Sequence, residues 1–344
     1  MVGDLIYLIL GLCAAMYMAW SLGANDAANP TDMAVGAGVV SLKKAVVLFA
    51  IFTTIGALVQ GYMVMKTIGK GVVVNIDPLG AFIASLTACI WITLATWKGM
   101  PISTTHSTVG AVLGIGLAYS FLYGMSSIRW SIVVNVILSW ITSPLMAIIL
   151  SIILYLALNR LALVLLSWGK NVDKFFKYFL LFNLAFSAYS FGVNDVGNAT
   201  GVYVAVASKI IGAPDMVTMF YLAALGSLGI AIGALTWGYR VINTVGFRIT
   251  RLDYVSATAA ELSNAIVVWG FSTIPKLLMG YGMPISTTHA SVSSVIGIGI
   301  IKSRSLKGVD WKVVTYIIIS WILTVPVTAF TSFILYITLA KLVP

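Results

Sequence analysis

The feature that most constrains the fold of this chain is a series of ten apolar segments, most of them close to the length of a membrane crossing. A helix rises about 1.5 Å per residue, so about 20 apolar residues cross a hydrocarbon core that is about 30 Å thick. Inside lipid every backbone N–H and C=O group needs a partner within the protein, and a helix supplies these partners within one segment. The sequence therefore predicts an all-α integral membrane protein. The segments lie near residues 5–22, 44–65, 79–97, 104–124, 130–158, 178–193, 216–238, 254–272, 285–301 and 312–340.

The composition agrees with a chain that lies mostly in lipid. Hydrophobic residues make up 60% of the sequence and charged residues only 9%, whereas soluble proteins carry about 25% charged residues. In a soluble protein the net charge of +10 would suggest a nucleic-acid partner. In a membrane protein Lys and Arg are retained in cytoplasmic loops. We therefore expect the lipid bilayer, and no nucleic acid, as a partner.

Several segments are short or are interrupted by Gly and Pro. Those within 79–124 and 254–301 are predicted either as full crossings or as re-entrant hairpins. The two longest, 130–158 and 312–340, exceed a simple crossing and are expected to be tilted or broken. The prediction is about 10–12 membrane segments, with broken or re-entrant helices among them.

Positive charge orients the chain in the membrane. Lys and Arg cluster near 160–177, 240–251 and 302–312. An extracellular N-terminus places all three clusters on the cytoplasmic side, as the positive-inside rule prefers. We expect a multi-pass protein of the plasma (inner) membrane with its N-terminus outside.

Two motifs occur twice, in the same order. Gly23–Asn29 (GANDAAN) recurs as Gly192–Asn198 (GVNDVGN), and Met100–Ser107 (MPISTTHS) recurs as Met283–Ala290 (MPISTTHA). The offsets are 194 − 25 = 169 and 289 − 106 = 183 residues. Five segments per half, an odd number, turn the second copy upside down, which is the inverted repeat of many secondary transporters. The predicted organisation is a first repeat over 1–159, a cytoplasmic connection over 160–177 and a second repeat over 178–344.

The Asn-Asp motifs place a carboxylate at membrane depth in each half. Asp26 and Asp195 each follow an apolar run, and burying such a charge costs at least about 2.5–3.5 kcal/mol. A cation is one way to offset this cost, and oxygen ligands suit a hard cation such as Na⁺. A role as helix caps is the alternative, and the duplication favours function. The neighbouring carboxamides belong to Asn25, Asn29, Asn194 and Asn198.

The Pro-Ile-Ser-Thr-Thr-His motifs predict two helix starts, with Pro101 and Pro284 in the first turn. A helix N-terminus attracts anions through its unpaired N–H groups and its dipole. Two such starts that face each other form an anion site without Lys or Arg. The alternative is that the hydroxyls only cap the helices or bond back to the backbone. The hydroxyl residues are Ser103, Thr104, Thr105, Ser286, Thr287 and Thr288.

Three further polar residues lie in apolar runs. His106 and His289, which end the second motif, can donate to an anion, relay protons or bond a backbone carbonyl, and the packing role is slightly favoured. Glu261 is the sole glutamate and a functional candidate because charges inside membranes are costly. No Cys cluster or His-x-x-x-His spacing accompanies the histidines, so no transition-metal site is expected.

These motifs resemble those of the inorganic phosphate transporter (PiT) family, of the sodium/phosphate symporter type. The resemblance rests on both Asn-Asp motifs and both Pro-Ile-Ser-Thr-Thr-His motifs, and it extends over nearly the whole chain, including Trp237–Ile242 and the region around Glu261. It implies phosphate uptake driven by Na⁺ or H⁺, inverted repeats, an extracellular N-terminus and a homodimer.

The chain departs from the family pattern at two places. Some members, mainly animal ones, carry a glutamate in a Phe-Glu-Thr-Thr stretch of the first half, where this chain has Thr53. The large central loop of those members is reduced here to 160–177. A few relatives carry sulfate or metal–phosphate complexes, so the resemblance does not fix the anion.

The motif chemistry and the resemblance together give candidate sites. The phosphate-binding candidates are Ser103, Thr104, Thr105, Ser286, Thr287, Thr288, Asn25 and Asn194. The Na⁺-binding candidates are Asp26, Asn29, Asp195 and Asn198. Candidates for coupling or support are Glu261, His106 and His289.

The predicted function is import of inorganic phosphate with Na⁺ by a secondary active transporter that works through alternating access. The alternatives are H⁺-coupled transport of phosphate or sulfate and, less favoured, an anion channel. An intramembrane enzyme is disfavoured because a nucleophile needs a base within hydrogen-bond reach, and adjacent residues such as Thr105 and His106 seldom point together. No cofactor is expected, and Na⁺ is the expected coupling ion.

Overall fold

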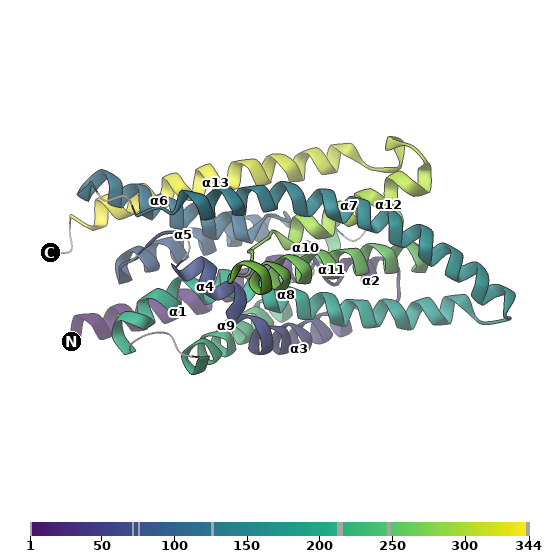
Figure 1. Cartoon of the computed structure of the whole chain (residues 1–344), viewed down its shortest axis with the longest axis horizontal. Coiled ribbons are helices and arrows are strands. Elements are labelled where there is room, and N and C mark those ends of the chain that lie inside the picture. The colour runs from purple at the N-terminus through teal and green to yellow at the C-terminus, as the bar shows by residue number, and fades with distance from the viewer. Residues whose placement is uncertain are drawn as a thin grey trace.

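The structure is a computed structural model that describes residues 2–70, 72–74, 76–124, 127–211, 216–245 and 249–341. These residues form a bundle of α-helices, with one isolated β-bridge between Val73 and Ile128 (Figure 1). The helices are α1 (Val2–Asp26), α2 (Asp32–Gly36), α3 (Leu42–Gln60), α4 (Tyr62–Lys70), α5 (Pro78–Trp97), α6 (Thr104–Tyr123), α7 (Trp130–Ser167), α8 (Val172–Ile211), α9 (Met216–Trp237), α10 (Tyr239–Val245), α11 (Tyr254–Met279), α12 (Thr287–Ser303), the 3₁₀ turn η1 (Leu306–Gly308) and α13 (Trp311–Leu339).

Seven of the described helices are long and apolar enough to cross a membrane, judged by length and hydropathy. They are α3, α5, α6, α7, α9, α11 and α13. Together with the helical architecture, this confirms the prediction of an all-α integral membrane fold.

The helices differ from the predicted segments in three places. The segment 44–65 is divided into α3 and α4 at Gly61, where a side chain would meet Val196 of α8. The long segments 130–158 and 312–340 are continuous helices that contain Pro144 and Pro326. The stretch 160–177 is mostly helical, because α7 extends to Ser167 and α8 begins at Val172.

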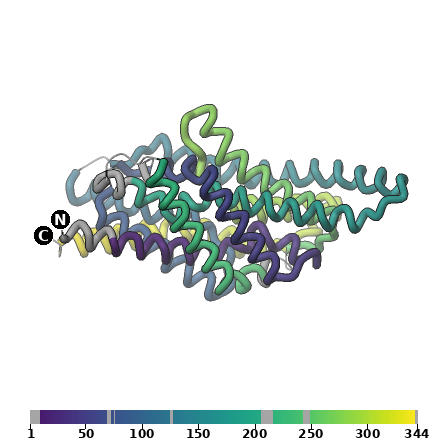
Figure 2. Tube along the Cα trace, turned by 90° about the horizontal axis from the view of Figure 1, so that it is seen from below, coloured from purple at the N-terminus to yellow at the C-terminus, as the bar shows by residue number. Residues whose placement is uncertain are grey.

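The α7–α8 hairpin projects from one end of the bundle (Figures 1 and 2). Both helices extend past the helices around them at this end, and only residues 168–171 between them are not helical. The hairpin joins the two repeats, so the second repeat starts outside the body of the bundle and returns into it through α8.

The two repeats interlock instead of packing as separate bundles. By their place in each repeat, α1, α3, α5, α6 and α7 correspond to α8, α9, α11, α12 and α13. Helix α6 packs against α13, and α12 packs against α7. Likewise α1 packs against α9, and α3 packs against α8. Each repeat therefore supplies the packing partners of the other.

Glycines allow two of these cross-repeat pairs to approach at backbone distance. A Cβ atom on Gly23 would lie 2.6 Å from a carbonyl carbon of α9, and one on Gly192 would lie 2.8 Å from a carbonyl carbon of α3. Gly233 and Gly56 make the matching approaches from the other helix of each pair. Small residues at helix crossings are the usual means of close packing inside membranes. These contacts hold the C-terminal end of α1 and the middle of α8, which carry the Asn-Asp motifs, in the centre of the bundle.

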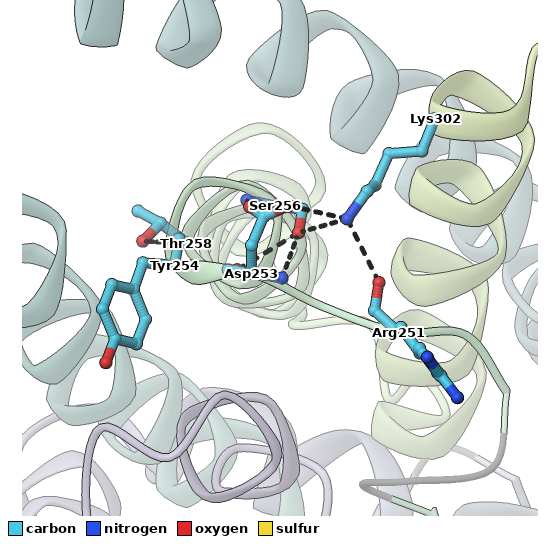
Figure 3. Close-up of polar contacts among 6 residues, drawn as sticks. All are labelled: Arg251, Asp253, Tyr254, Ser256, Thr258 and Lys302. Atoms are coloured by element: carbon cyan, nitrogen blue, oxygen red, sulfur yellow. Dashed lines mark hydrogen bonds and ion pairs between the residues drawn. The ribbon is translucent and has the colours of Figure 1, made fainter. Parts of the chain in front are cut away.

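The start of α11 is tied to the end of α12 at the surface of the bundle. The Asp253 carboxylate accepts from the Ser256 N–H at 2.9 Å, and the Ser256 hydroxyl accepts from the Asp253 N–H at 2.8 Å, which makes a capping box. Lys302 donates to the Asp253 carboxylate at 2.6 Å and to the Arg251 carbonyl at 3.2 Å (Figure 3). Helices α11 and α12 form a hairpin whose turn carries the second Pro-Ile-Ser-Thr-Thr-His motif. These bonds join the two helices at the end away from that turn.

Candidate functional site

The two Pro-Ile-Ser-Thr-Thr-His motifs form matching helix starts. Ser103 is the N-cap of α6 and accepts from the His106 N–H at 3.2 Å, and Ser286 caps α12 by accepting from the His289 N–H at 3.2 Å. The helices begin at Thr104 and Thr287. The expectation that Pro101 and Pro284 lie in the first turn is wrong, because a serine cap outcompetes a proline start and leaves each proline two residues before the cap.

The asparagine before each aspartate holds the extended segment that precedes a helix start. The Asn25 carboxamide accepts from the Ile102 N–H at 3.2 Å and donates to the Met100 carbonyl at 3.0 Å. The Asn194 carboxamide likewise accepts from the Ile285 N–H at 3.1 Å and donates to the Ile285 carbonyl at 2.9 Å. The structure thus places Asn25 and Asn194, both phosphate-binding candidates, against backbone groups.

The aspartates lie among the threonine hydroxyls of the helix starts. Thr104 donates to the Asp26 carboxylate at 2.5 Å, and Thr288 of the other repeat donates to it at 3.4 Å. The Asp195 carboxylate accepts from Asn194 at 3.1 Å and from Asn198 at 2.8 Å. Both aspartates are fully buried, and they are close enough to interact electrostatically.

The second asparagine of each motif reaches the helix start of the opposite repeat. Asn29 donates to the hydroxyls of Thr287 and Thr288, both at 3.1 Å. Asn198 donates to the Thr105 hydroxyl at 2.9 Å. Each repeat therefore positions the hydroxyls of the other.

Two further hydrogen bonds, both donated by threonine hydroxyls, join the two repeats. Thr105 donates to the Ile285 carbonyl at 2.8 Å, and Thr288 donates to the Ile102 carbonyl at 3.0 Å. The segments before α6 and α12 are thus bonded directly to each other's helix starts. All twelve phosphate-binding and Na⁺-binding candidates converge on this one region, and each is at most 3% exposed.

The charge balance of this region has a chemical consequence. No Lys or Arg is buried in the part of the chain whose side chains the structure describes, so the two carboxylates have no protein cation beside them. Their oxygens, with the Asn198 carboxamide oxygen, which has no hydrogen-bond partner among the described residues, suit a hard cation. The starts of α6 and α12 present backbone N–H groups to an anion. The site can therefore hold a cation and an anion side by side.

The two histidines form an aromatic cluster behind the helix starts. Their rings are 4.6 Å apart between centroids, and each ring packs in a tilted arrangement against a tryptophan ring at a centroid distance of 3.8 Å, His106 against Trp140 and His289 against Trp321. Nδ1 of His106 lies 3.3 Å from the Trp321 carbonyl, and Nδ1 of His289 lies 3.2 Å from the Trp140 carbonyl. A carbonyl only accepts, so Nδ1 is the donor. Each histidine is thus bonded to a backbone carbonyl, which is one of the three roles that the sequence left open.

Sequence reasoning missed Trp140 and Trp321, which lie inside the predicted apolar segments 130–158 and 312–340. A signal for them exists, because Ser139-Trp140-Ile141 of α7 recurs as Ser320-Trp321-Ile322 of α13, each shortly before a proline. Glu261 does not lie among the threonines. Its neighbour is Asp32 of α2, and the two are close enough to interact electrostatically.

Comparison with known proteins agrees with this geometry. The model of the phosphate transporter family matches residues 22–332. A protein of Pyrococcus horikoshii named as a phosphate permease is 33% identical, and the alignment covers 96% of this chain and 97% of that protein. One of Pyrococcus abyssi with the same name is 34% identical over the same shares of the two chains.

A solved structure is also similar over its full length. It is described as the sodium-dependent phosphate transporter, with a TM-score of 0.86, 29% sequence identity and coverage of 98% of this chain and 100% of that chain. These similarities identify the chain as a multi-pass membrane transporter of phosphate and not an enzyme. The chain belongs to the phosphate transporter family.

Proposed function

We propose that this protein imports phosphate by symport with Na⁺, through alternating access to the single site that both repeats build. The proposal is carried by one observation: two buried carboxylates and two helix N-termini meet in one place without a buried Lys or Arg among the described side chains. A carboxylate attracts a cation and a helix N-terminus attracts an anion. The cation and the anion lie next to each other and offset each other's charge, so the two ions bind together. The similarity to a solved sodium-dependent phosphate transporter supports sodium as the cation.

The cation side consists of Asp26, Asp195, Asn29 and Asn198. The carboxylates supply the negative charge, and the Asn198 carbonyl oxygen supplies a neutral ligand. Asn29 uses its amide hydrogens on Thr287 and Thr288, so only its oxygen is left for a cation.

The anion side consists of the first turns of α6 and α12. Phosphate oxygens accept from backbone N–H groups there and from the Thr287 hydroxyl. The Thr104 hydroxyl donates to the Asp26 carboxylate and so joins the anion side to the cation side. Ser103 and Ser286 hold the first turns as caps, and Thr105 and Thr288 lock them to the opposite repeat. Asn25 and Asn194, whose carboxamides are already bonded to the backbone, position the site.

A cavity at the surface lies next to the segment that precedes α6. A surface cavity of about 860 Å³ is lined by Lys98, Met100, Pro101, Lys312 and Tyr316. Pro101 directly precedes Ile102, whose N–H is bound by Asn25. The cavity adjoins the end of the bundle that carries the basic connection 302–312, so we place it on the cytoplasmic side, where its lysines would receive phosphate that leaves the site.

The deciding experiment is uptake of labelled phosphate into proteoliposomes under a Na⁺ gradient, a pH gradient or neither. We expect uptake against a phosphate gradient only with Na⁺. Uptake that follows the pH gradient and ignores Na⁺ would replace sodium by protons as the coupling ion. Uptake in competition with arsenate and sulfate defines the anion. Downhill flux alone, with single-channel currents, would support a channel instead.

We also place the protein in the plasma (inner) membrane as a homodimer with an extracellular N-terminus. The charge clusters support the orientation. The lipid-facing sides of α7 and α13 support contact with a second copy or with lipid, because Ile149 and Ile322 are 58% and 67% exposed. Labelling of single cysteines introduced near Lys170 and Lys307 from either side of the membrane tests the orientation. Mass measurement in detergent tests the dimer.

A further inference from the structure

The cavity that we place on the cytoplasmic side is lined by two lysines with unpaired ammonium groups. Lys98 caps the end of α5 at the turn of the α5–α6 hairpin, and Lys312 lies in the first turn of α13. Both side chains are exposed, and neither ammonium has a hydrogen-bond or ion-pair partner within the described part of the chain. Two elements from different repeats thus bring two free positive charges to one cavity of about 860 Å³.

The other polar groups of the described lining are compatible with an anion. Thr315 adds a hydroxyl. The carboxylate of Asp310 is used as the cap of α13, because its Oδ1 accepts from the N–H groups of Lys312 and Val313 at 3.0 and 3.2 Å. The formal charge of the described lining is 2 − 1 = +1. Ammonium and hydroxyl groups are donors that phosphate oxygens accept from.

The cavity wall is continuous with the central site. Met100 and Pro101 line the cavity, and the Met100 carbonyl accepts from the Asn25 carboxamide at 3.0 Å. The Tyr316 hydroxyl, also in the lining, donates to the Met100 sulfur at 3.2 Å. A ligand in the cavity therefore lies against the segment that Asn25 holds in place before α6.

The lysine pair is not a product of the internal duplication. The Pro-Ile-Ser-Thr-Thr-His motifs are 289 − 106 = 183 residues apart, so the counterpart of Lys98 is residue 98 + 183 = 281, which is Tyr281. The Ser-Trp-Ile stretches of α7 and α13 are 321 − 140 = 181 residues apart, so the counterpart of Lys312 is residue 312 − 181 = 131, which is Ser131. Both counterparts are neutral. The pair of positive charges therefore belongs to one side of the molecule, the side that releases phosphate in the proposed import.

Positive charge at an exit acts differently from positive charge at an entrance. Lysines at an entrance speed the capture of an anion, whereas lysines at an exit retain it. Alternating access requires this cavity to close when the central site opens to the outside, so an anion in the cavity stabilises the cytoplasm-facing state. We propose that Lys98 and Lys312 form a regulatory site for a phosphate group, whose occupation slows further uptake. The inference rests on the proposed function for the direction of transport.

A phosphate group can reach the cavity from two sources. One is free phosphate on the cytoplasmic side, and the other is the headgroup of an anionic lipid, which basic pockets at the cytoplasmic ends of membrane helices recognise. Ile317 and Ile319 of the lining provide an apolar wall beside the lysines, and Ile319 is 50% exposed. The recognised chemistry is the same for both sources, and the experiments below separate them.

The first test measures binding without transport. Purified full-length protein in detergent receives potassium phosphate or potassium chloride at equal ionic strength, without Na⁺, so that the central site does not hold its ion pair. A ligand that binds the native state raises the midpoint of thermal unfolding. We expect phosphate to raise the midpoint of wild type and of Lys307→Gln, and to raise that of Lys98→Gln/Lys312→Gln less or not at all. Lys307 is an exposed lysine outside the lining.

A parallel arm replaces phosphate by a short-chain phosphatidylglycerol, with the matching phosphatidylcholine as its control. A shift with phosphate identifies free phosphate as the source, and a shift with phosphatidylglycerol alone identifies the lipid. Equal shifts in all three proteins, or no shift with either probe, overturn the site.

The second test measures regulation in phosphatidylcholine proteoliposomes that are loaded with increasing concentrations of phosphate. The initial rate of Na⁺-driven uptake by wild type should fall as luminal phosphate rises. Lys98→Gln/Lys312→Gln should need about three- to tenfold more luminal phosphate for the same inhibition, because each exposed ammonium contributes modestly to binding. The external phosphate concentration for half-maximal uptake should stay the same, and Lys307→Gln should behave as wild type. If the lipid is the source, phosphatidylglycerol in the vesicles should slow wild type more than the double variant.

The failure of this inference differs from the failure of the proposed symport. Identical inhibition curves for wild type and Lys98→Gln/Lys312→Gln, with and without phosphatidylglycerol, overturn the regulatory site and leave the symport intact. Wild-type uptake that ignores Na⁺ defeats the symport, and the binding measurement still decides whether the two lysines hold a phosphate group.

Discussion

The imidazole of His289 donates through Nδ1 to the backbone carbonyl of Trp140, at 3.2 Å, across the boundary between the two repeats. That carbonyl is available for a local reason. In an α-helix the carbonyl of residue i accepts from the N–H of residue i+4, and the residue four positions after Trp140 is Pro144, which has no N–H. The proline therefore creates the acceptor that ties the start of α12 to α7.

This relationship predicts a coupling between His289 and Pro144. We expect His289→Ala to destabilise the wild-type protein by about 1–3 kcal/mol, because a buried hydrogen bond and packing are lost. In a Pro144→Ala background the new N–H of residue 144 competes for the Trp140 carbonyl, so the same change should cost about 0.5–1.5 kcal/mol less. A double-mutant cycle on thermal unfolding measures the difference. Strictly additive effects would show that Pro144 does not act through His289.

The central carboxylates are predicted to be essential for coupled uptake. We expect Asp26→Asn and Asp195→Asn each to lower Na⁺-driven phosphate uptake by at least about 100-fold, which corresponds to about 2.7 kcal/mol. The reason is that each change removes a charged ligand from a buried site. Uptake in proteoliposomes is the measurement, with membrane insertion checked in parallel and Asp173→Asn as the exposed control. Wild-type rates in both variants would disprove the assignment of these residues to the cation.

Asn25 is predicted to act on the shape of the site. Asn25→Ala removes the bonds to the Ile102 N–H and the Met100 carbonyl, which leaves buried backbone groups unpaired at about 1–3 kcal/mol. We expect a lower unfolding temperature and weaker phosphate binding, with the Na⁺ concentration for half-maximal uptake changed less than threefold. The control is Asn159→Ala, which alters an exposed asparagine on α7. A large shift in Na⁺ dependence alone would instead make Asn25 a cation ligand.

The glycine crossings are predicted to be intolerant of a methyl group. A Cβ on Gly192 would lie within 2.9 Å of the α3 backbone, so Gly192→Ala must displace a helix and should cost about 1–3 kcal/mol. Gly270 lies on α11, and its nearest neighbour would be a side-chain carbon of Ile274 at 3.8 Å. Gly270→Ala should therefore be neutral or stabilising. Thermal unfolding of the two variants tests the contrast, which fails if both behave alike.

The Asp253–Lys302 pair is predicted to make a pH-dependent contribution to stability. Partial burial raises the pKa of the Asp253 carboxyl, but its bonds to Lys302 and to the Ser256 N–H outweigh this effect and hold the pKa below its ordinary value. Because the folded pKa lies below the unfolded value, the contribution is complete above about pH 4 and is lost as the pH falls through the folded pKa. The pair is partly exposed, so we expect at most about 1 kcal/mol.

The measurement for this pair is the difference in unfolding temperature between wild type and Lys302→Met, taken from pH 7 down to pH 3. The difference should shrink below about pH 4. Lys307→Met, which alters an exposed lysine in the neighbouring turn, serves as the control. A difference that stays constant with pH would mean that Lys302 acts by packing alone.

Much of the fold could be predicted because membranes impose strong local rules. The apolar run before Asp26 and the repeated Pro-Ile-Ser-Thr-Thr-His motif are visible without any tertiary information. The residues at which the helices begin and end were less predictable. The break at Gly61 depends on the side chain of Val196, which belongs to another helix far along the chain, and the start of α6 depends on whether Pro101 or Ser103 takes the first position.

The candidate site was predicted in its residue types more than in its contacts. The motifs indicated a cation side and an anion side, and the structure brings both into one region. The bonds of Asn25 to Ile102 and of Asn29 to Thr287 join residues 77 and 258 positions apart, and no local pattern specifies such pairs. The same holds for Asp32, which reads as an ordinary polar residue after Asn29 until α2 packs against Glu261 of α11.

The sequence by itself therefore determined three properties of this protein: its place in the membrane, its duplication and the chemistry of its polar motifs. Each follows from local physical rules, because the free energy of burying a segment in lipid and the capping of a helix depend on neighbouring residues. Only the tertiary structure decided that the repeats interlock, that each motif is completed by the opposite repeat, and that Asp32 meets Glu261. Those contacts arise from helix packing, which depends on side chains from segments that the chain brings together only when it folds.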